Sequence, residues 1–271
     1  MKLASLSGMG LLALSLFTGG LLTGCSTVPV TGRHELNLVS ADQEMQLGFS
    51  SFDQLKKDTP ISHDPTANAM VERVGKRIAA VAGKDLPNAQ WEFVVFDSKE
   101  ANAFCLPGGK VGVYTGLLPI AKDDGGLATV LGHEIGHAVA HHGASRMSEA
   151  MVTQKVGEGA SGLVGSSSYS QYQSAFMTAY GLGSKVAVDL PYSRKMESEA
   201  DHIGVVYMAR AGYDPKEAVA FWQRFMEYSK QQGGSSTPTL LRDHPVDEVR
   251  IKQLQGWLPE AQAEFAKSAP H

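Results

Sequence analysis

Two histidines stand four residues apart in the middle of an apolar segment that has the spacing of a helix. The segment reads His133-Glu134-Ile135-Gly136-His137 at its centre. Residues four apart lie on one face of a helix, about 6 Å apart along its axis, so both imidazoles can reach one ion at roughly 2.0 to 2.1 Å. Glu134 is rotated by about 100° from His133 and can instead reach a water beside the ion, as a general base must. The segment therefore predicts a metal site on a helix.

Two histidines leave a catalytic zinc ion short of one protein ligand, because such sites supply three ligands and keep one position for water. His141 follows His137 by four residues. It lies about 12 Å from His133 along a continuous helix, so one ion cannot bind all three rings. The third ligand is therefore expected elsewhere in the chain.

A second helix with an acidic start offers that ligand. Glu197 and Asp201 are four residues apart and share a face. We expect one carboxylate to bind the ion and the other to accept the free ring N–H of a ligand histidine. Because Glu199 faces away, the ligand is assigned to Glu197 and the supporting role to Asp201. Taken alone, the same residues would be an ordinary solvated helix start, which the helix dipole favours.

The remaining pattern indicates one mixed domain over residues 40–271. Helices are expected from Ser40 and from Asp64-Pro65, where a capping residue precedes an apolar stripe. A further helix is expected after Gly125-Gly126. Residues 91–96 have strand character, and the segments 103–106 and 111–114 flank a Pro-Gly-Gly turn that is typical of a hairpin. We therefore predict an α+β fold that is dominated by helices and has a small β-sheet.

The first residues have the character of a targeting segment. Residues 1–24 carry Lys2 and then an apolar, glycine-rich stretch that ends before Cys25. We interpret them as a lipoprotein signal peptide, with Cys25 as the lipid-modified residue and residues 25–39 as a lipid-anchored tether. An uncleaved transmembrane anchor is the alternative. Cys105 would then have no partner in its own chain, and it is either buried packing or a redox-active thiol.

The composition argues against some partners. The net charge is −4, and basic residues form no stripe along the sequence. A nucleic-acid-binding domain usually concentrates Lys and Arg on one face. We therefore expect no nucleic-acid partner.

These motifs resemble the family of zinc metallopeptidases that includes the heat-shock protease HtpX and the CAAX prenyl proteases, and above all its periplasmic lipoprotein branch of the LoiP and BepA type. The resemblance rests on six stretches: residues 30–33, 102–104, 107–113, 133–137, 193–194 with 197–201, and 244–245 with 250–251. It implies a zincin-like metallopeptidase domain with one Zn²⁺ per chain. It also implies an outer-membrane lipoprotein that faces the periplasm, an address for which Ser26 is typical.

The resemblance also implies roles for residues outside the two helices. Asn102, Ala103 and Phe104 resemble the edge strand on which such enzymes bind an extended substrate by main-chain hydrogen bonds. An ordinary hairpin arm is the alternative. His244 resembles a histidine that approaches the metal, either as a catalytic donor to the oxyanion or as a latch on the water position. Arg250 is expected to support the site.

Together these observations predict a zinc-dependent endopeptidase, with Glu134 as the general base, that acts on misfolded or stalled envelope proteins. Its expected partners are extended or unfolded polypeptides, the membrane through Cys25, and outer-membrane protein assembly factors. The alternative is a non-proteolytic chaperone or adaptor lipoprotein whose zinc site is structural and latched by His244.

Overall fold

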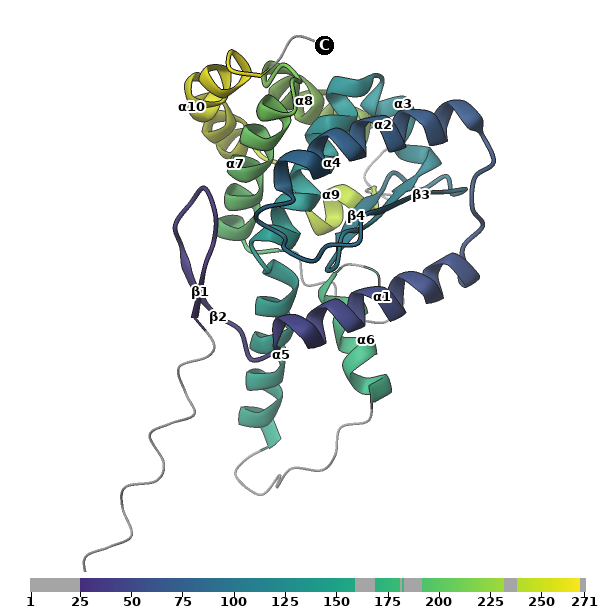
Figure 1. Ribbon diagram of the computed structural model, residues 1–271, viewed down its shortest axis with the longest axis vertical. Helices are drawn as coiled ribbons and strands as arrows, with labels where there is room; N and C mark the ends of the chain where they lie inside the picture. The colour runs from purple at the N-terminus through teal and green to yellow at the C-terminus, as the bar shows by residue number, and fades with distance from the viewer. Residues whose placement is uncertain (1–24, 159–168, 181, 183–191, 232–237, 269–271) are drawn as a thin grey trace, which may run out of the picture.

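The computed structural model describes residues 25–158, 169–180, 182, 192–231 and 238–268. Helices make up most of these ranges (Figure 1). They are α1 (Ala41–Asp58), α2 (Pro65–Ala82), η1 (Thr115–Leu117), α3 (Leu118–Ala121), α4 (Asp124–Val139), α5 (His142–Glu158), α6 (Tyr169–Ala179), α7 (Arg194–Arg210), α8 (Lys216–Gln231), α9 (Thr239–Asp243) and α10 (Glu248–Phe265). The strands are β1 (Cys25–Thr27), β2 (His34–Leu36), β3 (Glu92–Phe96), β4 (Ala103–Leu106) and β5 (Lys110–Tyr114). The predicted helix-dominated α+β class is confirmed.

The main sheet has the strand order β3-β5-β4. β3 runs parallel to β5, and β4 runs antiparallel to it. The predicted hairpin is present between β4 and β5. Its turn needs Gly108 and Gly109, whose φ angles of 79° lie in the left-handed region that glycine adopts at little cost. In the strand order β3-β5-β4, β4 lies at one edge of this sheet.

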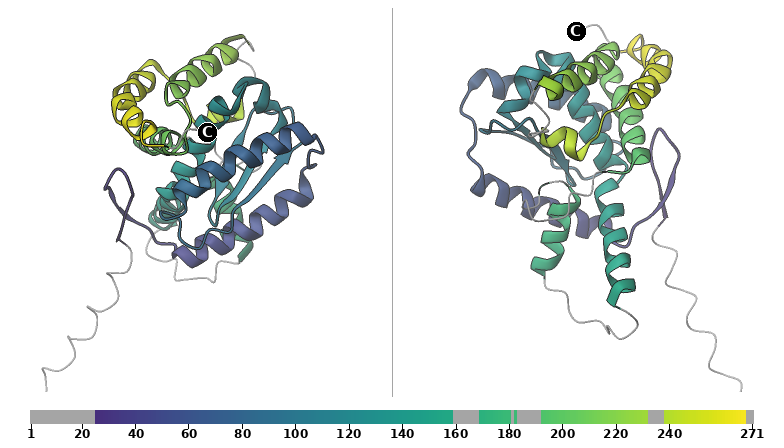
Figure 2. Two further views of the ribbon diagram at one scale, coloured as in Figure 1. Left: turned by 45° about the horizontal axis from the view of Figure 1, so that its top comes forward. Right: turned by 180° about the vertical axis from the view of Figure 1, so that it is seen from behind.

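Strand periodicity sorts the side chains of the sheet onto two faces. Odd-numbered residues such as Val95, Cys105 and Val113 join a core with α2, α4 and α7. Even-numbered residues such as Phe96 and Phe104 join a separate aromatic core with α1 and α6. The sheet is thus a middle layer, and α4 lies between it and the group formed by α7, α8 and α10 (Figure 2).

Helix starts follow the capping rules used on the sequence. Ser40 caps α1 in a capping box with Gln43, and the Asp64 carboxylate accepts hydrogen bonds at the start of α2. The helix that carries the paired histidines begins slightly earlier than expected, at Asp124, because Asp123 accepts a hydrogen bond from the Gly126 N–H. Gly125 and Gly126 therefore belong to the first turn of that helix and do not precede it.

The N-terminal segment differs from the expected tether. Residues 25–36 form an antiparallel hairpin of β1 and β2, in which Val28 is buried in the core. The tether prediction missed this hairpin because its strands are only three residues long and largely polar. The signal peptide predicted for residues 1–24 lies outside the described residues. None of the helices that the structure describes has the length and apolar character needed to cross a bilayer.

Glycine allows α4 and α7 to cross at very short range. A Cβ atom on Gly132 would lie 2.7 Å from the carbonyl oxygen of Gly204, and one on Gly204 would lie 2.8 Å from the backbone nitrogen of His133. One turn further on, a Cβ on Gly136 would lie 2.8 Å from the Ala200 carbonyl oxygen. The backbones of the two helices therefore touch directly, and any side chain at these positions would force them apart.

Replacing Gly132 by alanine is expected to lower the free energy of unfolding by about 1 to 3 kcal/mol, because the added methyl group overpacks the contact. Chemical denaturation followed by circular dichroism measures this change. Gly256→Ala is the matched control, since a Cβ at Gly256 in α10 meets nothing within 4 Å. That control is expected to be neutral or to stabilise by up to about 1 kcal/mol. Equal effects of the two substitutions would contradict the close crossing.

Candidate metal centre

The α4–α7 crossing places the predicted site residues face to face. His133, Glu134 and His137 lie on α4, and each is at most 4% exposed. Glu197 lies in the first turn of α7. Ser193 caps this helix, and its side chain accepts a hydrogen bond from the Met196 N–H. The helical spacing of four residues turns both α4 imidazoles toward this carboxylate.

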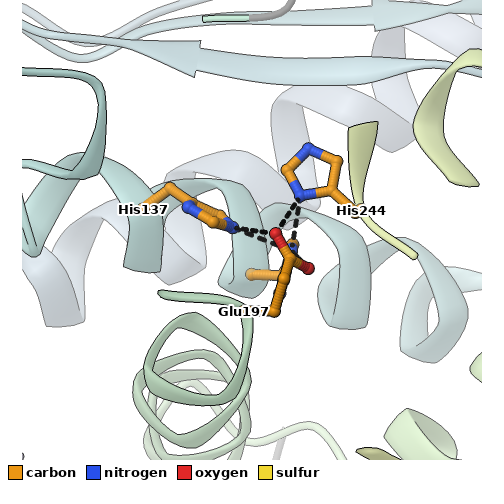
Figure 3. A group of neighbouring side chains, drawn as sticks. His137, Glu197 and His244 are labelled. Atoms are coloured by element: carbon orange, nitrogen blue, oxygen red, sulfur yellow. Dashed lines mark hydrogen bonds and ion pairs between the residues drawn. The ribbon is translucent and has the colours of Figure 1, made fainter. Parts of the chain in front are cut away.

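Four side chains bring one donor atom each to a common point. His133, His137, Glu197 and His244 have donor atoms that all lie within 4.8 Å of one another. The Nε2 atoms of His133 and His137 are 3.1 Å apart, and Oε1 of Glu197 is 3.3 Å from Nε2 of His137. Nδ1 of His244 is 2.9 Å from Oε1 of Glu197 (Figure 3). The sequence analysis assigned His133, His137 and Glu197 as ligands, and the family resemblance gave His244 as a histidine near the metal.

These residues fit a tetrahedral metal ion. Metal–ligand bonds of about 2.0 to 2.1 Å place tetrahedral ligands about 3.3 to 3.4 Å from each other, close to the separations between the donors here. The Nε2 atoms of His133 and His137 face each other. In a neutral ring whose Nδ1 carries the proton, Nε2 carries a lone pair, so the two lone pairs repel each other. An ion between them removes that repulsion. His133, His137 and Glu197 would therefore hold the ion, with His244 beside them.

Burial and charge favour the protonation states that metal binding needs. Burial lowers the pKa of His133 and that of His137, so both rings are neutral and can ligate. Burial opposes ionisation of Glu197, but the charges of His244 and Arg250 outweigh it and hold the pKa of Glu197 well below its usual range. The group therefore offers two neutral rings and one carboxylate.

Asp201 and Arg250, the two residues expected to support the site, lie against this group. Oδ1 of Asp201 lies 2.9 Å from Nδ1 of His133, which leaves Nε2 of that ring facing the other donors. Arg250 on α10 donates to Asp201 and pairs with Oε2 of Glu197 at 2.7 Å. The guanidinium also lies over the ring of Trp222, 4.4 Å from its centre. One buried cation thus balances two buried carboxylates.

Glu134 stands beside the donor group without joining it. Its Oε1 is buried and accepts no hydrogen bond from the residues that the structure describes. Burial raises its pKa to about 7, the His244 imidazole opposes that rise and the Glu197 carboxylate adds to it. A carboxylate whose pKa lies near neutrality is suited to take up and release a proton.

His244 lies between the base and the ligand carboxylate. Its Nδ1 faces Glu197, and its Nε2 lies 3.7 Å from Oε1 of Glu134. Burial opposes protonation of this ring, but the charges of Glu197 and Glu134 raise the pKa of His244 to about 9. The ring therefore fills the space between the two glutamates.

The predicted substrate-binding residues lie outside the donor group. Asn102 precedes β4, and its carbonyl accepts from the Tyr114 N–H at 3.0 Å. Ala103 and Phe104 belong to the edge strand, but their side chains point into the two cores. A substrate on this edge would therefore meet main-chain groups. That role stays a prediction.

Two residues near the centre, His142 and Tyr192, escaped the sequence analysis, and Glu199 was set aside there as facing away. Nδ1 of His142 lies 2.9 Å from Nδ1 of His137, and Nε2 of His142 lies 3.0 Å from Oε2 of Glu199. The ring of Tyr192 stacks on that of His244 with centres 5.1 Å apart. The position of His142, five residues after His137, could have indicated that the two rings lie close together, whereas nothing in the sequence pointed to Tyr192. His141, excluded as a ligand, bonds Glu44 at 2.8 Å.

Comparison with known proteins agrees with this geometry. Residues 65–258 match Peptidase family M48. The mitochondrial metalloendopeptidase OMA1 of Schizosaccharomyces pombe is 37% identical over 240 residues, which cover 87% of this chain and 67% of that protein. The mitochondrial metalloendopeptidase OMA1 of Homo sapiens is 30% identical, with 94% of this chain and 49% of that protein covered. The β-barrel assembly-enhancing protease of Escherichia coli (strain K12) is 28% identical, with 83% and 46% covered.

The fold, the paired histidines on α4 and the glutamate on α7 define a metalloprotease. The chain belongs to Peptidase family M48. The family that the sequence resembles is thereby confirmed. Its periplasmic lipoprotein branch is not, because the mitochondrial OMA1 proteins are more similar to this chain than the Escherichia coli protease is. The chain spans about half the length of the human and Escherichia coli relatives.

Asp201→Asn is expected to weaken zinc binding by about 10- to 100-fold, because the neutral amide removes the charge that strengthens the hydrogen bond from His133 and balances Arg250. Competition with a chromophoric chelator measures the dissociation constant. Glu260→Gln is the control, since Glu260 makes a similar 2.8 Å contact to a histidine, His202, but on the surface. An Asp201→Asn protein with unchanged zinc affinity would contradict the supporting role.

Proposed function

We propose that this chain is a zinc-dependent endopeptidase that cleaves misfolded or stalled envelope proteins in the bacterial periplasm. The observation that carries the proposal is the convergence of His133, His137 and Glu197 on one point, with Glu134 beside it. Two imidazoles and one carboxylate are a common ligand set of catalytic zinc in peptidases. The family membership agrees with peptide hydrolysis.

In the proposed reaction the ion would activate the carbonyl and the water, and residues of the chain would transfer protons and orient the ligands. Zinc, when bound, polarises the scissile carbonyl and lowers the pKa of a water toward about 7. Glu134 takes the proton of the attacking water on its free carboxylate oxygen and delivers it to the leaving amine. His133 is held by Asp201, so the ligand face keeps its orientation through both proton transfers.

The β4 edge is the proposed substrate platform. β4 pairs with β5 on one side, which leaves its other side as a sheet edge. α4 packs against β4, so the edge runs near the helix that carries the base. An extended chain bound to the main chain of Asn102, Ala103 and Phe104 would be recognised by its backbone with little sequence choice. Unfolded polypeptides are therefore the proposed substrates.

The proposed location is the periplasmic face of the outer membrane, with lipid on Cys25 as the anchor. The apolar signal pattern of residues 1–24 and the cysteine that follows support it. The similarity to the β-barrel assembly-enhancing protease of Escherichia coli supports a role among outer-membrane assembly factors. The net charge of −4 gives no support to a nucleic-acid partner.

A second candidate function follows from the fourth donor. With His244 included, the group has four protein ligands, which is the arrangement of a structural zinc site. A permanently closed site would suit a chaperone or adaptor lipoprotein without proteolysis. We favour a latch that opens, because Glu134 would have no partner to act on in a purely structural site.

Glu134→Gln is expected to lower casein hydrolysis by at least about 10²- to 10⁴-fold, because it removes the proton acceptor while the ligand set stays intact. His137→Ala is expected to lose both zinc and activity. Zinc quantification beside a proteolysis assay on the purified protein separates the two effects. Hydrolysis by Glu134→Gln at the wild-type rate would sink the assignment of the base.

His244→Ala is expected to raise casein hydrolysis several-fold, because it clears the space between Glu134 and Glu197 that the ring now fills. Initial rates at saturating substrate measure the change, and His63→Ala, at an exposed position between α1 and α2, is the control. A fall in kcat with an unchanged KM would instead assign His244 as the donor to the oxyanion. An inactive wild type together with an inactive variant would favour the structural site.

A further inference from the structure

The second ligand histidine has its own chain of hydrogen bonds. His133 is backed by Asp201 and Arg250. His137 is backed instead by His142, whose Nδ1 lies 2.9 Å from Nδ1 of His137. The His142 ring is fully buried, and its centre lies 4.8 Å from that of His137 at an angle of 70°. The contact is therefore an edge-on hydrogen bond and not a stacking contact.

The direction of this hydrogen bond follows from the role of His137. A ring that offers the Nε2 lone pair to a metal ion carries its proton on Nδ1. The Nδ1–H of His137 therefore donates to Nδ1 of His142. Because that nitrogen accepts, the ring proton of a neutral His142 is on Nε2. That N–H then donates to Oε2 of Glu199, 3.0 Å away. Each of the three groups thus fixes the tautomer or charge of the next.

The outer end of the chain is held by the N-terminal hairpin. Nε of Arg33 donates to Oε2 of Glu199 at 2.6 Å, and the Thr31 hydroxyl donates to Oε1. Arg33 also donates to the carbonyl oxygen of Ala140, the C-cap residue that follows α4. The turn that presents both residues is closed by the Gly32 N–H and the Val28 carbonyl at 2.9 Å. The hairpin therefore clamps the helix end beside His137.

We propose that His142 and Glu199 are positioning residues that orient the ligand His137, and that the hairpin residue Arg33 completes this support. We name the set His142, Glu199 and Arg33 the histidine relay. The inference rests on the proposed metal centre, because His137 needs a fixed tautomer only if it ligates. It gives the β1–β2 hairpin a role in metal binding although no hairpin residue belongs to the donor group.

The test measures zinc affinity and not activity. His142→Leu is expected to raise the zinc dissociation constant by about 10- to 100-fold, the usual effect of losing the partner of a ligand histidine. His142→Asn is expected to recover most of the affinity, because its carbonyl oxygen can accept from Nδ1–H of His137. The d–d absorption of the cobalt-substituted protein is expected to shift in His142→Leu and to return toward wild type in His142→Asn.

Two further variants keep the test decisive if the buried leucine prevents folding. Glu199→Gln and Arg33→Met act at the outer end of the histidine relay, where the Arg33 side chain is 37% exposed. Each is expected to weaken zinc binding in the same direction as His142→Leu, by a smaller factor. The double variant His142→Leu with Glu199→Gln is expected to bind zinc no more weakly than His142→Leu alone, because the two act in series.

His141→Asn is the matched control. His141 is the neighbouring histidine, bonds Glu44, and has a φ of 49° that asparagine tolerates. Its zinc affinity is expected to equal that of wild type. Folded His142→Leu and Glu199→Gln proteins with wild-type zinc affinity and cobalt spectra would overturn the histidine relay, and so would losses that simply add. A wild type that binds zinc but hydrolyses no peptide would contradict the proposed function and leave the affinity results for the relay intact.

Discussion

The direct backbone contact between α4 and α7 is the constraint on which the site depends. Gly132 and Gly204 remove the side chains that would otherwise separate the helices. Without that proximity, a carboxylate in the first turn of α7 could not reach two imidazoles on α4. The four donor residues are buried at this crossing, so their charges have to be balanced by the protein. Packing and chemistry are therefore set by the same few glycines.

The balance of buried charge is achieved by long-range pairing. Glu197 and Asp201 come from one helix, and Arg250, which faces both, comes from another at a distance of about fifty residues in sequence. Taking a carboxylate out of water is costly unless it is paired and hydrogen-bonded. Here each ligand imidazole has its outer nitrogen bonded to a further group, Asp201 for one and His142 for the other. The donor group is thus oriented before any ion binds.

Local periodicity explains how much of this could be predicted. His133, Glu134 and His137 share one helix, and Glu197 and Asp201 share another, so a spacing of four residues fixes which of them face together. The capped helix starts and the β4–β5 hairpin follow from short-range rules in the same way. His142 lies beyond the end of α4, after a residue with positive φ, where helical spacing no longer applies. Glu199 meets Arg33 across 166 residues, which no local pattern encodes.

The way Arg250 is bonded links two events that would otherwise be independent. The same guanidinium nitrogen that pairs with Glu197 also donates to the carbonyl oxygens of His244 and Pro245. A displacement of the segment before α10 that withdraws the His244 ring must also strip those two acceptors from Arg250. Withdrawal of the His244 ring from the donor group and a change in how Arg250 pairs with Glu197 are consequently coupled, because the same guanidinium nitrogen contacts both segments.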